Sequence, residues 1–476
     1  MCAEERRLRF GVLSFTGTGH LNPLFGLSQE LQRRGHRVTF FERPKIEDRV
    51  RHAGLDFVPL RTQKFVEQKP APTRYSGTFA DISNLRFNLA RVRFEIQQYL
   101  KETPSALAAA GIDALLINEI ALTGPTVAQL LGLPYFLIAT TVPHHFGWSG
   151  RFWSGRSWRG RFWHDSSRFS GYRASTSWIS WLESRYLELS ALRTRGPIRR
   201  ALDADRRQLG LGPVRGIPKE FPCLAHITQL PQCLDFEHVA QSAGIYYSGP
   251  WISTTARPQV EFPWDRIDGR PLIYATLGTT RNVQPAVFRM IAQACADLNL
   301  QLVIALGNRM DPELLAGLPG EPLVVRFAPQ LELIKLARVV ISHAGFNTSS
   351  EALMEGKPMI VIPLAYDQPA IAARLAHFRI AQVLPFKRLS AHKLCAALTN
   401  VLNDPTYEQA AQKMRNKLRS VDGTRRAADI ISVEMEGYAA RRQLILRADR
   451  CSAGEQGSGQ DKRRQTPQPT VSTIAR

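Results

Sequence analysis

The sequence predicts an α/β protein with two doubly wound domains, each built on a parallel sheet. Strand-like apolar runs alternate with helix-like segments through most of the 476 residues, which is typical of parallel sheets covered by helices. The alternation occurs twice, and a stretch rich in Pro, Gly, Ser and Thr separates the two halves, as expected of a linker. A chain of this length also exceeds what one compact core usually holds. We therefore expect domains over 1–245 and 272–440, a linker over 246–271, and a ligand cleft between the domains.

Apolar runs mark the expected strands. In the N-terminal half they are FGVLSF, HRVTFFE, DALLINE and LPYFLIAT, and in the C-terminal half they are LIYATLGT, LQLVIALG, LVVRFAP, RVVISHAG and PMIVIPLA. Residues 441–476 end in a stretch with few apolar side chains and many Gly, Ser, Gln and Pro. We expect a disordered basic tail there, because such a composition cannot bury a core.

The turn after the first expected strand reads FTGTGHLNPLFG and contains a histidine. Gly17 and Gly19, with Glu42 at the end of the next strand, suit a dinucleotide site, in which glycines let pyrophosphate approach a helix N-terminus. However, Asn22 stands where the third glycine is expected, and His20 takes up space that phosphates need. The sequence of this turn therefore indicates that the His20 side chain points towards a ligand at the edge of the sheet where ligands bind. The alternative is a histidine in the turn that is hydrogen-bonded to nearby backbone.

The helix after this turn is expected to begin at Asn22. Asn is a good N-cap, Pro23 suits the first helical position, and Gly35 supplies a left-handed stop. His20 would then lie between the end of the strand and the start of the helix.

Composition points to a soluble cytoplasmic protein. No run of about 18 apolar residues is present that could span a bilayer. The first apolar run is interrupted by Arg9 and leads straight into the turn, which is unlike a signal peptide. The six cysteines show neither CxxC nor metal-finger spacing, a pattern typical of reduced thiols without disulfides or structural zinc.

The formal net charge of +21 attracts polyanions such as nucleic acid or an anionic membrane surface; the alternative is a general bias of the genome towards arginine. Residues 148–181 interleave arginines with six of the eight tryptophans. No nucleic-acid-binding module surrounds this segment, so we expect a surface for a lipophilic acceptor or a membrane. The alternative is an irregular loop packed on its own aromatic rings. The tryptophans concerned are Trp148, Trp153, Trp158, Trp163, Trp178 and Trp181.

The sharpest pattern lies in residues 326–375. The run VVIS is expected to be a buried strand, followed by a turn at His343 and a helix that Asn347 caps and Gly356 ends. Backbone amides at such a helix start, helped by the macrodipole, form an anion site. His343 can add a donor to the same phosphate.

Two further pairs of polar residues suit a nucleotide sugar. Asn347 and Glu351 are four residues apart, so they share one helix face. A diphosphate could contact the helix tip while a ribose reaches the carboxylate one turn deeper. Asp367 and Gln368 follow the next expected strand, and a carboxylate beside an amide suits adjacent hydroxyls of a sugar.

This block resembles the nucleotide-sugar motif of the UDP-glycosyltransferase superfamily. The family pattern is W/F-x-P-Q, then H-x-G-x-N-S/T-x-x-E, then P-x-x-x-D/E-Q. The similarity extends over roughly residues 8–435 and is strongest to bacterial members that glucosylate carotenoids, sterols or polyketides. It implies the GT-B fold, in which two Rossmann-like domains face each other across a cleft and the final helices return towards the N-terminal domain. The matching residues are Phe327, Pro329, Gln330, His343, Gly345, Asn347, Thr348, Glu351, Pro363, Asp367 and Gln368.

The resemblance assigns roles within the nucleotide-sugar site. It implies that Phe327 stacks on uracil, that Gln330 holds the nucleoside end and that Glu351 binds the ribose. The remaining assignments are His343, Gly345, Asn347 and Thr348, with Gly278 and Thr279 of the TLGTT turn, for the diphosphate, and Asp367 and Gln368 for the hexose hydroxyls.

In this family the first turn carries G-H-x-x-P, matched here by Gly19, His20 and Pro23, and its histidine is the catalytic base. A neutral imidazole can take the proton of an acceptor hydroxyl as that oxygen attacks the anomeric carbon. Family members usually orient this histidine with an aspartate, but the aligned position is Asn118, followed by Glu119. Asn118 could orient His20 without offsetting its charge. We expect Glu119 to substitute through a one-residue shift; the alternative is a weakened pair.

The resemblance therefore implies an inverting glycosyltransferase. It would move a hexose, most simply glucose from UDP-glucose, to a hydroxyl of a hydrophobic small molecule of the carotenoid, sterol or polyketide type. The helix N-terminus would stabilise the departing UDP, with no metal or other cofactor required. We expect UDP-glucose and a lipophilic acceptor as partners, peripheral contact with an anionic membrane on its cytoplasmic face, and neither a nucleic acid nor an obligate protein partner.

A second class of function is a GT-B protein that binds nucleotide sugars but has lost efficient catalysis. Such a protein would dock on a membrane or a nucleic acid through its basic aromatic segment. Asn118 points to this alternative and the intact His20 points against it. In either case we expect parts of 75–100 and 140–185, the variable segments of the first domain, to form the acceptor pocket.

Overall fold

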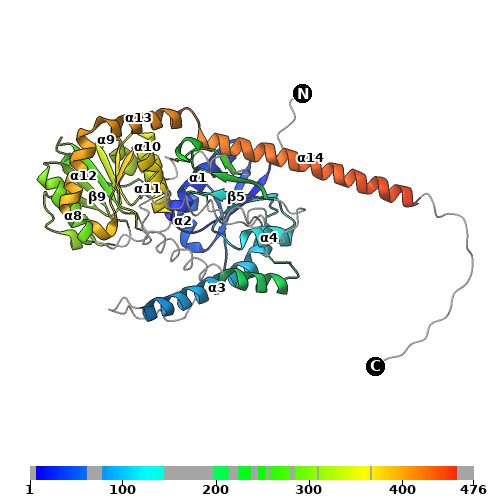
Figure 1. The fold of residues 1–476 in the computed structure, drawn as a ribbon. Coiled ribbons are helices and arrows are strands. Elements are labelled where there is room, and N and C mark those ends of the chain that lie inside the picture. The colour runs from blue at the N-terminus through cyan, green and yellow to red at the C-terminus, as the bar shows by residue number, and fades with distance from the viewer. Residues whose placement is uncertain are drawn as a thin grey trace, which may run out of the picture.

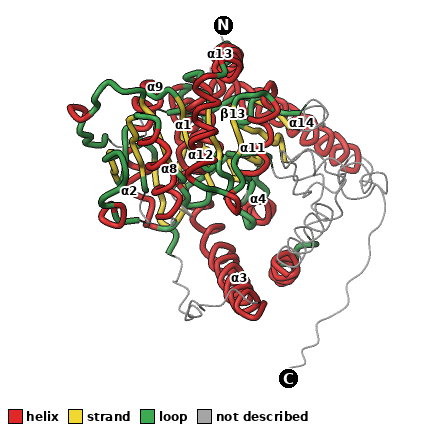
Figure 2. Tube along the Cα trace, turned by 60° about the vertical axis from the view of Figure 1, so that its left-hand side comes forward, coloured by secondary structure: helices red, strands yellow, loops and turns green. Residues whose placement is uncertain are grey.

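Two parallel sheets, each flanked by helices, confirm the α/β prediction with two doubly wound domains (Figure 1). Figure 2 shows the strands enclosed between helices. The computed structural model describes residues 7–61, 78–143, 197–213, 223–236, 245–253, 257, 259–278, 285–307, 310–364 and 367–457, with side chains except at 78–88 and 445–457.

The N-terminal sheet has seven strands in the order β3-β2-β1-β4-β5-β6-β7. β1 pairs in parallel with β2 on one side and with β4 on the other, so the winding reverses beside β1. Ligands of doubly wound sheets bind at such a switch point, beyond the carboxyl ends of the strands. The turn that carries His20 begins there. The strands are β1 (Arg9–Leu13), β2 (Arg37–Glu42), β3 (Asp56–Pro59), β4 (Ala114–Asn118), β5 (Tyr135–Ala139), β6 (Cys223–Thr228) and β7 (Ile245–Tyr247).

The first helix packs its apolar face on this sheet. Leu24, Leu27 and Leu31 recur at helical spacing and are fully buried in one cluster with the strands, because positions three and four apart share a helix face. Gly35 follows the helix with φ of 87°. The helices of this domain are α1 (Thr18–Arg33), α2 (Glu47–His52), α3 (Thr78–Ala109) and α4 (Gly124–Leu131), with short 3-10 turns η1 (Pro44–Ile46) and η3 (Gln232–Leu234).

The C-terminal sheet repeats the plan with six strands in the order β10-β9-β8-β11-β12-β13. β8 pairs with β9 and with β11, so the turns after β8 and β11 meet at its switch point. The strands are β8 (Leu272–Thr276), β9 (Gln301–Ala305), β10 (Leu323–Val325), β11 (Val339–Ser342), β12 (Met359–Val361) and β13 (Ala381–Val383). The helices are α8 (Pro285–Asp297), α9 (Gln330–Leu336), α10 (Phe346–Met354), α11 (Gln368–His377), α12 (Ala391–Asn403) and α13 (Pro405–Arg419), with 3-10 turns η4 (Trp264–Arg266), η5 (Pro312–Leu315) and η6 (Phe386–Arg388).

The last helix, α14 (Gly423–Gly457), leaves the C-terminal domain and lies along the N-terminal domain (Figure 1). Ala427, Ile431 and Met435 are buried in the same cluster as α1 and β1. Arg34 of α1 adds an ion pair, with its Nη2 2.7 Å from Asp429 Oδ1. The start of α14 therefore joins the two domains.

The same helix corrects the expected disordered tail, which was placed from residue 441. α14 continues to Gly457, because the run YAARRQLILRADR is rich in Ala, Leu, Gln and Arg, which favour helix, and contains no Gly or Pro. The prediction of disorder therefore applies only to residues 458–476, which contain Gly and Pro, and these residues lie outside the described part of the chain.

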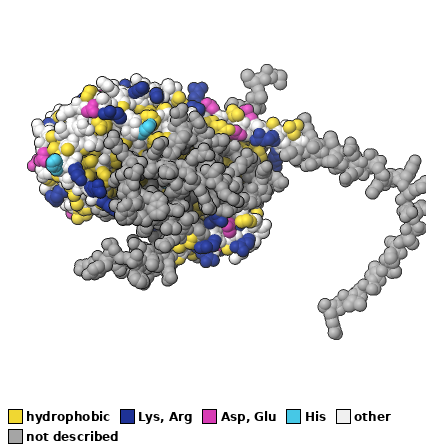
Figure 3. Space-filling view, in the orientation of Figure 1, with side chains coloured by type: hydrophobic (Ala, Val, Ile, Leu, Met, Phe, Trp, Pro, Cys, Tyr) yellow, Lys and Arg dark blue, Asp and Glu magenta, His cyan; other side chains and the backbone are white. Residues whose placement is uncertain are grey.

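Several other expected features also lie outside the described residues. They are the tryptophan-rich segment 148–181, Thr279, and most of the expected acceptor segments. On the face drawn in Figure 3, Lys and Arg side chains are spread over both domains and α14, with acidic side chains between them. None of the described helices combines the length and the apolar character that crossing a membrane requires.

Candidate active site

His20 lies in the first turn of α1, beyond the carboxyl end of β1. The helix begins at Thr18 with Gly17 as its N-cap, so the expectation that Asn22 caps the helix is wrong. The Asn22 side chain instead accepts a hydrogen bond of 3.0 Å from Arg49 Nη2, which is a tertiary contact that local propensity does not anticipate. Pro23 consequently lies inside the helix.

The imidazole of His20 contacts polar groups at the ends of β4 and β5, the next two strands of the sheet on one side of β1. Its Nδ1 atom lies 2.7 Å from Thr140 Oγ1, directly after β5, and 3.5 Å from Asn118 Nδ2. Asn118 also donates to Thr140 Oγ1 at 3.1 Å. Its own oxygen accepts from the Ile120 N–H at 3.2 Å, which orients the NH2 group towards Thr140 and His20. Sequence reasoning missed Thr140, although its position after the LPYFLIA strand was a usable signal.

Glu119 has a different position from the one expected. Successive side chains of an extended strand point to opposite faces, and Glu119 continues β4 through a backbone hydrogen bond of 3.0 Å to Ile138. Its Oε2 atom lies 3.3 Å from Nε2 of His226 on β6, and the Glu119 side chain is 4% exposed. The structure thus brings Asn118 to His20 Nδ1 and Glu119 to His226.

Phe15 forms an exposed apolar wall beside His20. The two rings meet edge to face with centroids 5.7 Å apart, and Phe15 is 51% exposed. An aromatic ring that stays this open next to a candidate base can contact the apolar body of a ligand.

The turn between β11 and α10 contains the second histidine of the motif. The ring of His343 lies against Gly278 and Gly345, where an added Cβ atom would be 2.6 Å and 2.5 Å from Nε2. Glycine is therefore required at both positions, and Gly278 also has φ of 80°. Burial lowers the pKa of His343 to about 4, although a backbone group of Thr276 opposes the shift. His343 is neutral at pH 7 and can offer an N–H but no positive charge.

The first turn of α10 presents open backbone amides. The helix starts at Phe346 with Gly345 as N-cap and without a side-chain cap, so the expectation that Asn347 caps it is wrong. Uncapped N–H groups and the helix dipole make this end suitable for an anion. Thr348 lies in the same turn and is 8% exposed.

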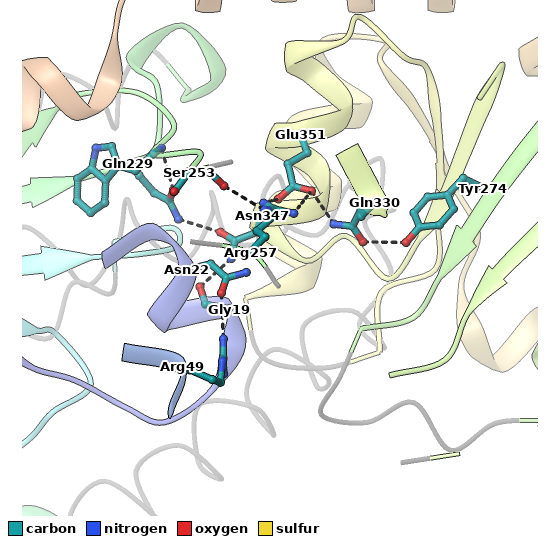
Figure 4. A network of polar contacts seen from close by, with 11 residues as sticks. Gly19, Asn22, Arg49, Gln229, Ser253, Arg257, Tyr274, Gln330, Asn347 and Glu351 are labelled. Carbon is teal, nitrogen blue, oxygen red and sulfur yellow. Dashed lines mark hydrogen bonds and ion pairs between the residues drawn. The ribbon is translucent and has the colours of Figure 1, made fainter. Parts of the chain in front are cut away.

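Asn347 joins the two domains. Its Nδ2 donates to the Gly19 carbonyl at 2.8 Å, and its Oδ1 accepts from Gln229 Nε2 at 3.0 Å; Gln229 also donates to the Thr140 carbonyl. Pro23 explains why the Gly19 carbonyl is available, since proline has no N–H to return to the residue four positions earlier. The motif proline thus leaves this acceptor to Asn347; Figure 4 shows Asn347 between Gly19 and Gln229.

Glu351 lies one turn further along α10 and is 3% exposed. Its carboxylate accepts from Gln330 Nε2 at 2.6 Å and from Arg257 Nη2 at 2.5 Å. The Tyr274 hydroxyl donates to Gln330 Oε1 at 2.9 Å, which completes the chain of contacts in Figure 4. The structure thus brings the motif residues Gln330 and Glu351 together. Sequence reasoning missed Arg257 because a linker arginine carries no motif.

The remaining motif residues surround this centre. Phe327 is 47% exposed just before α9, so a face is available for stacking. Asp367 is the N-cap residue of α11 by position and accepts a hydrogen bond of 2.5 Å from Thr141 Oγ1 of the N-terminal domain. The Gln368 oxygen accepts from the Leu364 N–H at 2.7 Å, which fixes its amide. In the part of the chain that the structure describes, no cluster of three or more His, Cys, Asp or Glu side chains could hold a metal ion.

Comparisons with known proteins agree with this geometry. Residues 226–420 match the family model described as UDP-glucoronosyl and UDP-glucosyl transferase, and residues 12–138 match the glycosyltransferase family 28 N-terminal domain. The zeaxanthin glucosyltransferase of Pantoea ananas is 27% identical over 423 residues, which cover 87% of this chain and 93% of that protein. The oleandomycin glycosyltransferase of Streptomyces antibioticus is 24% identical over 462 residues, with 96% and 98% covered.

Solved structures confirm the GT-B fold. The glycosyltransferase of kitacinnamycin superposes with a TM-score of 0.66 at 23% identity and covers 90% of this chain and 99% of its own. The glycosyltransferase VinC in complex with DTDP has a TM-score of 0.61 at 17% identity, with 90% and 100% covered. The family 28 match covers β1 to β5 of the N-terminal sheet, and the UDPGT match covers the whole C-terminal sheet together with the last two strands of the N-terminal sheet, β6 and β7.

Proposed function

We propose that this chain, a glycosyltransferase of the UDP-glycosyltransferase superfamily with the GT-B fold, transfers glucose from UDP-glucose to a hydroxyl of a hydrophobic small molecule with inversion. The observation that carries the proposal is the meeting of two turns across the cleft. The Asn347 amide of the α10 turn bonds to the Gly19 carbonyl beside His20, at 2.8 Å. A donor held at α10 would thus have its anomeric carbon near the imidazole.

His20 acts as the general base in this proposal. Its Nδ1 is engaged with Thr140, so Nε2 is the atom that takes the proton from the acceptor hydroxyl. As the proton moves, the acceptor oxygen forms a bond to the anomeric carbon and the bond from that carbon to the UDP oxygen breaks. Attack opposite the leaving group inverts the anomeric configuration.

Donor binding uses the motif residues in the roles that the resemblance implied. Phe327 and Gln330 hold uracil and the nucleoside end, Glu351 the ribose, and Asp367 with Gln368 the hexose hydroxyls. The diphosphate lies at the open amides of α10, with Asn347, Thr348, Gly278 and the neutral His343 around it. Those amides stabilise the charge on departing UDP, and the mechanism requires no metal.

The acceptor is proposed to be a lipophilic alcohol of the carotenoid, sterol or polyketide type. The exposed ring of Phe15 beside His20 supports this class, as do relatives named for zeaxanthin and oleandomycin. Such acceptors partition into membranes, and the net charge of +21 favours peripheral contact with an anionic surface on the cytoplasmic side. Glucose as the sugar rests on the zeaxanthin glucosyltransferases among the relatives.

A weakly catalytic nucleotide-sugar-binding protein is the second candidate, and one observation favours it. The NH2 group of Asn118 faces His20 Nδ1, whereas a carboxylate would accept an Nδ1–H and stabilise the imidazolium. In the tautomer with an unprotonated Nε2, the Nδ1–H donates to Thr140 Oγ1, a neutral acceptor. This arrangement orients the ring but weakens it as a base.

The test is UDP release from UDP-glucose with zeaxanthin, a sterol and a macrolide aglycone, comparing the wild type with His20→Ala. We expect acceptor-dependent release to fall by about 10²- to 10⁴-fold while UDP binding by calorimetry is unchanged. His392→Ala, an exposed histidine on α12, is the matched control and should retain full activity. Equal release by the wild type and His20→Ala would exclude His20 as the base, and tight UDP binding without turnover of any acceptor would favour the binding protein.

A further inference from the structure

The carboxylate of Glu351 is engaged by two side chains of the protein itself. Arg257 Nη2 lies 2.5 Å from Oε1, Arg257 Nη1 lies 3.5 Å from Oε2, and Gln330 Nε2 lies 2.6 Å from Oε2. Two oxygens that ribose hydroxyls would need are therefore held by a guanidinium and an amide. The guanidinium comes from the linker, far along the chain from the donor motif.

Arg257 lies on the solvent side of this pair. Its side chain is 22% exposed, against 3% for Glu351, so the arginine covers the carboxylate. Its Nε donates to the Ser253 carbonyl at 3.2 Å, which ties the guanidinium to the linker. A carboxylate this buried needs a counter-charge when no ligand is bound, and Arg257 supplies it.

The diphosphate site next to this pair lacks a positive side chain among its assigned residues. Gly278, Asn347 and Thr348 are uncharged, and burial keeps His343 neutral, with its pKa near 4. Among the described residues assigned to this site, the amides and dipole of α10 supply the positive field, which amounts to about half a positive charge. A diphosphate held there would gain from one further cation.

We propose that Arg257 is an exchange residue of the donor site. It neutralises Glu351 in the free protein, and when ribose hydroxyls take its place on Glu351 the guanidinium moves to the diphosphate. Asn347 and Glu351 are four residues apart on α10, a rise of about 6 Å, which is within the reach of an arginine side chain. The donor thus provides both new partners at once, hydroxyls for the carboxylate and phosphate for the guanidinium.

This inference rests on the proposed donor site and can fail independently of it. Calorimetric titrations with UDP and with uridine, which lacks the phosphates, separate the two halves of the exchange. In Arg257→Ala we expect uridine to bind as tightly as in the wild type or tighter, because its competitor for Glu351 is gone. UDP should bind about tenfold or more weakly, because a charge-assisted contact is lost. The preference for UDP over uridine therefore falls at least about tenfold.

Two further variants make the result specific. Arg257→Lys keeps the charge without the planar fork and should retain most of the preference for UDP. Arg270→Ala removes an exposed linker arginine that pairs with Asp268 at 2.6 Å and should leave the preference unchanged. Thermal unfolding without nucleotide verifies that each variant is folded.

Three results would overturn the exchange. If Arg257→Ala tightens UDP and uridine equally, the arginine only blocks Glu351. If it weakens both equally, the arginine only supports the carboxylate. If Arg257→Ala prefers UDP over uridine as strongly as Arg270→Ala does, Arg257 does not contact the diphosphate. A wild-type protein that binds neither UDP nor UDP-glucose would instead remove the proposed function itself.

Discussion

The turn after β1 and the turn after β11 have the same local plan but different surroundings. Each follows a central parallel strand, places a glycine as N-cap of the next helix and carries a histidine. His20 is partly exposed and bonded through Nδ1 to Thr140. His343 lies against two glycines, and burial lowers its pKa to about 4. The comparison shows that the surroundings of each histidine, rather than the shape of the turn, determine its role. His20 is a candidate base, whereas His343 is a neutral side chain next to the proposed phosphate site.

The largest expected effect concerns the burial of His343. Burial lowers its pKa to about 4 from the ordinary histidine value of about 6.5, so the unfolded chain binds a proton between these pH values and the folded protein does not. Stability should therefore fall as the pH is lowered from about 6.5 to about 4, by at most about 3 kcal/mol. Urea unfolding at a series of pH values measures this loss. His343→Gln should reduce the slope, and an unchanged slope would contradict the burial argument.

The packing of His343 against glycine gives the next effect. Gly278→Ala would place Cβ 2.6 Å from His343 Nε2 in a residue with φ of 80°, so we expect a loss of about 2–3 kcal/mol in unfolding free energy and weaker UDP binding. Gly269→Ala is the matched control, because Gly269 has φ of 85° and no atom within 4 Å of the added Cβ. Denaturant unfolding of the two variants isolates the contact. Equal losses would mean that backbone strain alone explains the requirement for glycine.

The variant Asn118→Asp changes the surroundings of the other histidine, because it gives His20 a charged partner. A carboxylate 3.5 Å from Nδ1 would hold the Nδ1–H tautomer and stabilise the imidazolium, so kcat/KM should rise about tenfold. The acid limb of the rate profile should move to higher pH. Steady-state rates across pH 5 to 9 test this. Glu119→Gln, which alters the neighbouring carboxylate beside His226, should change the rate far less; a larger effect from that variant would return the orienting role to Glu119.

The smallest expected effect concerns the link between the two turns. Pro23→Ala returns an N–H to the helix, which competes with Asn347 for the Gly19 carbonyl. We expect kcat/KM to fall by roughly two- to fivefold, with stability unchanged or higher. Pro104→Ala, inside α3, restores a helical N–H elsewhere and should leave the rate unchanged. In an Asn347→Ala background Pro23→Ala should have no further effect, and a persistent effect would show that the proline acts by another route.

Sequence reasoning failed at both helix starts for one physical reason. Asn22 and Asn347 were expected to cap α1 and α10, yet both helices begin earlier, at glycines with extended backbone. The asparagine side chains are used for tertiary contacts instead, with Arg49 for Asn22 and with Gly19 and Gln229 for Asn347. Local propensity cannot weigh a partner that lies far away in the sequence.

The sequence alone determined the two doubly wound domains and most of the central strands, because hydrophobic periodicity and turn residues are local signals. It also determined the ordered donor motif and the position of His20 at the end of β1. Tertiary structure alone decided that Asn118 and Thr140 meet His20 and that Glu119 meets His226. It also decided that Arg257 covers Glu351 and that His343 is neutral. Contacts between residues far apart in the chain, and the burial of side chains, arise only when the elements pack together. Local sequence patterns therefore do not predict them.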